Sequence, residues 1–172
     1  ARLTVYRNLT RPAAARQWAE VGRLLAEAGR AVPDSAEVPL LEAEVLVAKG
    51  DVPGAKRLLT AARDARPNEP EFWFALATLA DRTGDNTAAH AILDEAAKTL
   101  GDTADLRIAR LRVTGYTSAE QAVAVLDGLG SGADKFAPDD RVRLFRALAS
   151  AYWLIDRPAL AAGLWERVAA LR

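Results

Sequence analysis

The apolar positions of this chain recur at spacings of three and four residues. Residues 70–101 show the pattern best, with one apolar stripe before Gly84 and another after Asp85. The stripes consist of Trp73, Leu76, Ala77 and Ala80, and then of Ala89, Leu93 and Ala96. This spacing puts the apolar side chains on one face of an α-helix, whereas a strand requires alternation every two residues. We therefore expect two helices here, and the same spacing elsewhere predicts an all-α chain.

The same pattern returns along the chain after a shift of 34 residues. The pairs that this shift brings into register are Gly50 with Gly84, Asp51 with Asp85, Ala55 with Ala89, Leu59 with Leu93, and Ala62 with Ala96. A further shift aligns Leu25, Ala28 and Pro33 with Leu59, Ala62 and Pro67. A fixed period in this range indicates a solenoid, in which each unit buries its apolar face by stacking on its neighbours.

Capping residues and helix breakers divide the chain into units. Helix starts are expected at Thr10, Asp51, Asp85, Ser118 and Asp156, whose side chains suit an N-cap, and Pro or Gly ends the helices. We expect one array over residues 1–172, made of a partial unit at 1–33 and units at about 34–67, 68–101, 102–130 and 138–172. A flexible insertion at 130–137 is expected to be pinned by Phe136. Because the chain contains no methionine, even at position 1, we interpret it as a fragment of a longer protein.

Composition narrows the function classes without naming one. The 23 basic and 23 acidic residues cancel, so no global field favours nucleic acid or an anionic membrane. No apolar run approaches the roughly 20 residues that span a bilayer. The absence of cysteine removes disulfides and thiolate metal sites and leaves the compartment open. Richness in Ala, Arg and Asp is typical of a bacterium with a GC-rich genome.

Catalytic chemistry finds little support in the residues. The only histidine, His90, follows buried Ala89 and is expected to be a solvated surface residue. Ser131 and Ser150 have no histidine partner in a shared motif, and the glycines near residue 130 follow a helix rather than a strand. Asp139 and Asp140 are explained by a helix N-terminus more simply than by a metal site. We expect no enzyme activity, cofactor or metal.

Taken in this register, the chain resembles the tetratricopeptide repeat family. The unit from Pro70 carries Trp73, Leu76, Ala77, Ala80, Gly84, Ala89, Leu93 and Ala96, and the last unit carries Phe145, Leu148, Ala149, Tyr152 and Ala161. Pro39, Glu42, Arg110 and Val168 depart from the family pattern, so the shared period is the more specific signal. The resemblance implies a right-handed α-solenoid of antiparallel helix pairs, with small residues where the helices approach to about 8–10 Å.

The resemblance also implies a concave groove lined by the first helix of each unit. The groove positions that it assigns are Glu37, Leu40, Glu44, Glu71, Phe74, Thr78, Asp81, Arg107, Leu111, Arg143, Arg146, Ser150 and Trp153. This lining passes from acidic to basic, which predicts a bipolar ligand with apolar anchors at Phe74 and Trp153. The basic clamp by which chaperone-binding members hold a C-terminal carboxylate is absent, since the corresponding positions hold Leu40, Glu44, Ala75, Ala104 and Ile108.

The four tryptophans are assigned different environments by the register. Trp73 and Trp165 fall on buried repeat positions, Trp153 falls on the groove face, and Trp18 is left open. The arginines near residues 107–112 and 141–146 are expected to lie on solvated faces, because acidic residues elsewhere in the chain balance them.

These patterns favour a non-enzymatic scaffold that holds a peptide or helix of another protein in its groove. The alternative is a structural spacer or oligomerisation segment of a larger enzyme or secretion machine. Self-association through apolar repeat ends is also expected, with Leu164, Trp165, Val168 and Leu171 forming the stripe at the last helix.

Overall fold

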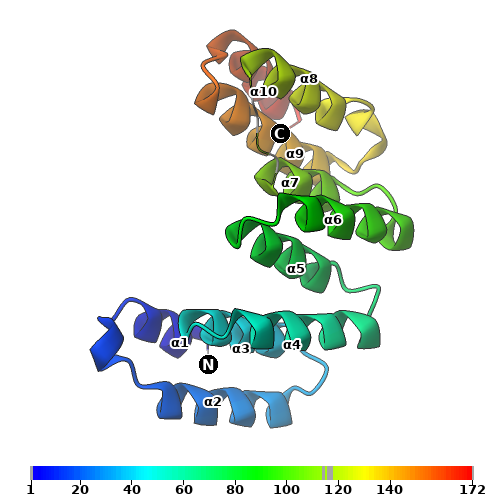
Figure 1. The fold of residues 1–172 in the computed structure, drawn as a ribbon. Coiled ribbons are helices and arrows are strands. Elements are labelled where there is room, and N and C mark those ends of the chain that lie inside the picture. Colours follow the sequence, from blue (N-terminus) through cyan, green and yellow to red (C-terminus); the bar gives the residue numbers. More distant parts are fainter. Residues whose placement is uncertain (1, 114, 116–117, 172) are drawn as a thin grey trace. The chain divides into compact units, whose positions relative to one another are not determined.

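The computed structural model describes residues 2–113, 115 and 118–171, and in this part of the chain every regular element is a helix (Figure 1). The all-α prediction is therefore confirmed. The predicted array extends over residues 1–172, of which residues 1, 114, 116–117 and 172 lie outside the described part of the chain.

The described chain folds into α-helices joined by short connections, with two 3-10 helices between them. The first five α-helices are α1 Arg2–Leu9, α2 Trp18–Ala31, α3 Glu37–Ala48, α4 Val52–Ala65 and α5 Pro70–Arg82. The remaining five are α6 Asn86–Leu100, α7 Ala104–Val113, α8 Ala119–Gly130, α9 Pro138–Leu154 and α10 Pro158–Ala170. The 3-10 helices are η1 Ala13–Ala15 and η2 Ala133–Lys135.

Several helices begin at the predicted caps because a side-chain oxygen accepts a free backbone N–H of the first turn. Asp51 accepts from Gly54 N at 2.8 Å, and Asp85 accepts from Ala88 N at 3.0 Å. Ser118 accepts from Gln121 N at 3.2 Å. Each bond satisfies one of the backbone donors that a helix N-terminus leaves unpaired, which confirms these three starts.

Two predicted starts are wrong. The hydroxyl of Thr10 donates to the carbonyl of Arg7 and so closes the end of α1, and the next α-helix begins only at Trp18, after η1. Asp156 adopts a left-handed conformation with φ 56°, and Arg157 stands at the N-cap of α10 without a side-chain cap. In both places the polar residue lies in the turn that ends the preceding helix, and it does not cap the following helix.

Glycines mark two of the sharp reversals between paired helices. Gly50 and Gly84 have φ of 85° and 82°, a region that residues with a Cβ rarely adopt. After each glycine the next N–H returns to a carbonyl of the preceding helix, from Asp51 N to Leu46 O and from Asp85 N to Ala80 O, each at 2.9 Å. This arrangement is the C-terminal motif expected where a left-handed residue ends a helix.

The chain divides into two compact units, Ala1–Leu79 and Ala80–Arg172, which we call the N-terminal and C-terminal units. In the N-terminal unit α3 lies against α1, α2 and α4 (Figure 1). Its apolar core contains Val5, Val21, Leu25, Leu41 and Val45. Trp18 is half-buried against this core, which settles the environment that the sequence left open.

The C-terminal unit is centred on α9, which packs against α7, α8 and α10. Its core includes Leu126 from α8, Leu144, Phe145, Leu148 and Tyr152 from α9, and Ala161 and Val168 from α10. Phe136 packs against this core and, as expected, pins the connection between α8 and α9. Because α9 is surrounded on several sides, its apolar residues cover more than one face of the helix.

The buried small residues and Trp73 follow the predicted register, whereas Trp165 does not. Ala77, Ala89 and Ala96 are at most 1% exposed. The Trp73 ring is buried, and its Nε1 donates to the carbonyl of Pro67 at 2.8 Å. Trp165 is 43% exposed, so its predicted core position is wrong. On α10 the inward face carries Ala161, Leu164 and Val168, and Trp165 lies at the edge of that face, about 100° around the helix from Leu164.

Candidate protein-binding surfaces

In the N-terminal unit, four of the predicted groove residues line one cavity of about 310 Å³. Glu37, Leu40 and Glu44 come from α3, and Glu71 comes from the first turn of α5. The spacing of Glu37, Leu40 and Glu44 by three and four residues puts them on one side of α3. Sequence reasoning missed the contribution of α1, which adds Arg2 and Tyr6 to the lining. Both residues lie before Leu25, the first position that the 34-residue shift aligns, so the repeat register did not point to them.

The charge of this cavity is predominantly negative. Nε of Arg2 lies 3.8 Å from Oε1 of Glu37, and the Arg2 guanidinium lies 5.8 Å from the centre of the Tyr6 ring. Within the described residues, Glu44 and Glu71 are exposed and take part in no ion pair. The cavity thus contains one carboxylate with a cationic partner and two without, beside an aromatic face that also attracts cations.

Four other predicted groove residues do not line this cavity: Phe74, Thr78, Asp81 and Leu111. Phe74 is half-buried and Thr78 is exposed on the N-terminal part of α5, and neither lines the cavity. Asp81 belongs to the C-terminal unit and is partly buried, and its backbone carbonyl accepts from Gly84 N at 2.9 Å. Leu111 packs against the core of the C-terminal unit.

The predicted groove residue Arg107 forms internal contacts in the C-terminal unit. Its side chain is only 12% exposed and its guanidinium lies 5.0 Å from the centre of the Phe136 ring. Nη1 donates to the carbonyls of Leu129 and Ser131, at 2.8 and 2.5 Å. These bonds satisfy carbonyls at the C-terminus of α8, so Arg107 holds the α8–α9 connection in place.

Asp102 completes this cluster. The hydrogen bonds from Arg107 lower the pKa of the Asp102 carboxyl well below its usual range; partial burial opposes the shift, and a 2.6 Å hydrogen bond from Lys135 adds to it. The hydrogen bonds from Arg107 and Lys135 lower this pKa because both cations stabilise the charged form of the carboxylate. The cluster therefore fixes one side of the connection electrostatically while Phe136 fixes it by packing.

Arg143, Arg146, Ser150 and Trp153 follow one face of α9 at three- and four-residue spacing. Arg143 is paired with Asp105 and with Asp140, the latter at 2.6 Å, and these hydrogen bonds raise the pKa of its guanidinium. Arg146 is exposed and, among the described residues, forms no ion pair. Trp153 is 67% exposed. The face therefore presents one unpaired cation and one large apolar surface.

Beside this face lies an apolar cleft of about 400 Å³. Ser150, Trp153 and Leu154 of α9 line it together with Trp165 of α10. Leu154 is 85% exposed. The exposed Trp165, which the sequence placed in the core, thus contributes instead to an apolar surface shared by the last two helices.

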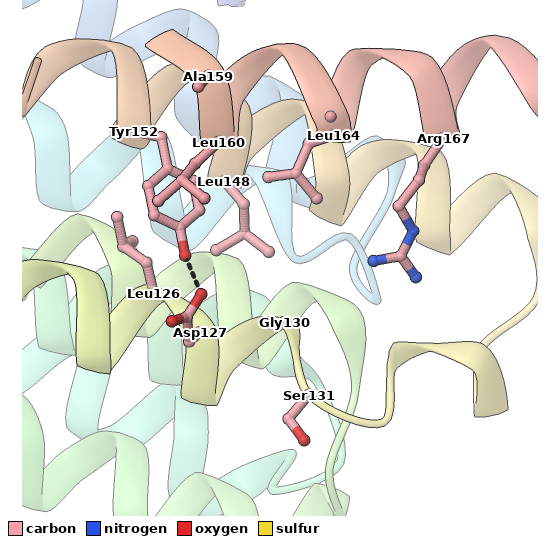
Figure 2. Close-up of a pocket in the computed structure, with 11 residues that line it drawn as sticks. Leu126, Asp127, Gly130, Ser131, Leu148, Tyr152, Ala159, Leu160, Leu164 and Arg167 are labelled. Carbon is pink, nitrogen blue, oxygen red and sulfur yellow. Dashed lines mark hydrogen bonds between the residues drawn. The ribbon is translucent and has the colours of Figure 1, made fainter. Parts of the chain in front are cut away.

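The C-terminal unit contains a further cavity, of about 450 Å³, between α8, α9 and α10 (Figure 2). Leu126, Leu148, Tyr152, Leu160 and Leu164 provide most of its apolar wall. At one end the Tyr152 hydroxyl donates to Oδ1 of Asp127 at 2.5 Å, and Arg167 lies toward the other end. Sequence reasoning missed this cavity. Its only trace in the sequence is small residues, such as Gly163, at positions where the repeat does not require a small side chain.

The described residues offer little to catalysis. His90 is exposed, as expected, and no group of three or more His, Asp or Glu side chains in this part of the chain could hold a metal ion. Asp139 and Asp140 stand in the first turn of α9, which confirms their interpretation as a helix N-terminus. In the ranges that the structure covers, every helix is too short or too polar to cross a membrane.

The consecutive helix pairs, with glycine reversals and buried alanines repeated after a fixed interval, place this chain among the helical-repeat proteins. The model of the tetratricopeptide repeat family matches it over residues 13–73 and 46–112. The chain belongs to the tetratricopeptide repeat family. No curated protein matches the sequence. Repeats of this family generally mediate protein–protein interaction, and its members are typically non-enzymatic scaffolds.

Proposed function

We propose that this chain is a non-enzymatic scaffold that binds a peptide or helix of a partner protein along the first helices of its repeats. The observation that carries the proposal is the acidic cavity of the N-terminal unit, because residues assigned to the groove from two different helices meet there. Glu44 and Glu71 are carboxylates without an ion-pair partner in the described residues, beside apolar Leu40. Such a surface complements a segment with a basic side chain next to an apolar one.

In the C-terminal unit, the proposed contact surface is the face of α9 that carries Arg146, Ser150 and Trp153. An exposed tryptophan two helical turns along the same face from an unpaired arginine favours a ligand segment that carries both an apolar and an acidic side chain. Arg143 supports this surface less directly, because its guanidinium is already paired with Asp105 and Asp140. Phe74 and Trp153 are proposed as the apolar anchors, and the charges as the groups that orient the ligand.

The test uses synthetic peptides as probes for the unidentified partner. A dodecapeptide of alternating lysine and leucine is titrated into the 172-residue chain and followed by fluorescence anisotropy, with a glutamate–leucine dodecapeptide as the charge-reversed probe. We expect the basic peptide to bind, and E44K to weaken it about tenfold, since a like charge then replaces an attractive one. Higher salt should slow association because it screens the long-range attraction.

The matched control is E95K, which makes the same charge change at an exposed position of α6 remote in sequence from the cavity. A general electrostatic effect would weaken binding equally in E44K and E95K, and that result would contradict the assignment of the cavity. Trp153→Ala tests the anchor on α9 with acidic, apolar peptides. If it leaves their binding unchanged in a folded protein, the face of α9 is not a binding surface.

The alternative function is a spacer or oligomerisation segment, and the apolar cleft of Trp153, Leu154 and Trp165 is the observation that favours it. Exposed tryptophan and leucine side chains favour association with another apolar surface. Light scattering at rising concentration tests this function. Association that is removed by a Leu154→Ser and Trp165→Ser double variant, together with no binding of either peptide, would support the alternative over the scaffold.

A further inference from the structure

The cavity between α8, α9 and α10 is separate from the surfaces proposed above. With 3.6 residues per turn, Leu148 and Tyr152 project from the side of α9 opposite to Arg146 and Ser150. Leu148 and Tyr152 are buried beneath the cavity, whereas Arg146 and Ser150 are exposed. The cavity therefore needs an explanation that does not depend on the peptide groove.

Small residues keep the cavity open. A Cβ built on Gly163 of α10 would meet no atom within 4 Å, and Gly163 lines the cavity. A Cβ built on Gly130, at the end of α8, would lie 3.3 Å from Cδ1 of Leu148. The space beside Gly163 is thus free, while Gly130 allows close packing at the floor. A volume of about 450 Å³ falls within the range of roughly 300–1,000 Å³ that small-molecule sites occupy.

The two ends of the cavity differ in charge. Asp127 accepts the 2.5 Å hydrogen bond of the Tyr152 hydroxyl and makes its end unfavourable for an anion. Toward the other end lies Arg167, whose guanidinium lies 4.1 Å from the centre of the buried Phe145 ring. This stacking fixes the plane of the guanidinium at the cavity wall.

Arg167 retains capacity to bind an anion. Its one ion pair in the described residues is a 3.5 Å contact with Asp134, which is 78% exposed and also lies 3.8 Å from Arg141. Among the same residues, Arg167 donates no hydrogen bond to an acceptor. Its planar N–H groups match the geometry of a carboxylate, which an arginine binds through two parallel hydrogen bonds.

We propose that this cavity binds a small molecule with an unbranched apolar chain and a carboxylate head, the carboxylate paired with Arg167 and the chain lying over Leu148 and Leu160. The apolar wall would exclude a highly polar ligand, because it offers few hydrogen-bond partners. The charge of Asp127 opposes the reverse orientation. Nothing in this proposal depends on a ligand in the peptide groove, so the two can fail independently.

The experiment uses octanoate as the probe and the whole 172-residue chain as the protein. Binding is followed by calorimetry and by the methyl NMR signals of Leu148, Leu160 and Leu164. For a ligand of this size we expect a Kd of about 1 mM or below. 1-Octanol, which has the same chain and an uncharged head, should bind at least tenfold more weakly because it cannot form the charge-assisted pair with Arg167.

The decisive variant is Gly163→Leu. It fills the cavity from α10 and improves the helix propensity of that position, so the fold should survive while octanoate binding is lost. Ala162→Leu is the matched control, because Ala162 is exposed, does not line the cavity and receives the same side chain. It should bind octanoate like the parent. Circular dichroism checks the fold of both variants.

Arg167→Gln tests the head group separately. It should weaken octanoate about tenfold or more and leave 1-octanol nearly unchanged, because only the carboxylate loses a charged partner. The proposal is overturned if octanoate fails to shift the three leucine methyl signals at millimolar concentration. It is equally overturned if Gly163→Leu binds octanoate like the parent, or if octanoate and 1-octanol bind alike.

Discussion

The guanidinium of Arg107 donates two hydrogen bonds to the carboxylate of Asp102, from Nε to Oδ1 at 2.9 Å and from Nη2 to Oδ2 at 2.7 Å. Its remaining terminal nitrogen donates to the carbonyls of Leu129 and Ser131. One side chain thus joins the residues before α7 to the end of α8. An arginine that the repeat register assigned to a binding groove is engaged in holding the unit together.

This pairing makes stability depend on pH in a defined direction. The folded-state pKa of Asp102 is lowered, so the stabilisation is present above the ordinary carboxyl pKa of about 3.9 and is lost as the pH falls below it. We expect D102N to lower the melting temperature at pH 7, and the difference from the parent to shrink in acid. Thermal melts between neutral and acidic pH measure it. D34N is the control, because Asp34 has no side-chain ion pair in the described residues. A difference that stayed constant with pH would contradict the assignment.

The packing around Ala89 should tolerate no larger side chain. Ala89 is completely buried on α6, and its neighbour His90 is exposed. We expect Ala89→Leu to cost about 1–3 kcal/mol of unfolding free energy through overpacking. His90→Leu should change it by less than about 0.5 kcal/mol. Urea denaturation of both variants is the measurement, and the opposite order of effects would mean that the two faces of α6 are reversed.

The cap of α6 should contribute measurable stability. Asp85 accepts a hydrogen bond from Ala88 N, which has no partner within the helix. Asp85→Ala should therefore cost about 1 kcal/mol, measured by urea denaturation. Asp85→Ser supplies another side-chain oxygen at the same place and should recover most of that loss. Equal destabilisation by alanine and serine would show that the negative charge, and not the hydrogen bond, is what matters at this position.

Trp73 and Trp165 should respond very differently to truncation, although the repeat register treats them alike. Trp73 is 6% exposed, lies under the Arg63 guanidinium and donates to the Pro67 carbonyl. We expect Trp73→Ala to cost about 3–5 kcal/mol. Trp165 is 43% exposed, and its replacement by alanine should cost no more than about 1 kcal/mol. Comparable losses in chemical denaturation would mean that Trp165 is buried after all.

The sequence by itself determined the parts of this protein that depend on local rules. The three- and four-residue spacing of apolar positions predicts the helices, and glycine or proline after each stripe predicts where they end. The caps at Asp51, Asp85 and Ser118 were predictable because a cap involves residues only a few positions apart. Burial of Ala77, Ala89 and Ala96 followed from the repeat period, since each unit packs in the same way.

Only the tertiary structure decided which side chains meet across helices. Arg107 was assigned to a groove from its position in the repeat. In the structure its guanidinium donates hydrogen bonds to carbonyls at the end of α8 and in the loop after it. Arg2 and Tyr6 line the acidic cavity from a helix that precedes the first aligned repeat positions. The cavity beside Gly163 exists because α8 and α10 both pack on α9 and leave space between them. Helix periodicity specifies the direction of a side chain from its own axis, whereas a contact also requires the position of the neighbouring helix, which depends on packing along the whole unit.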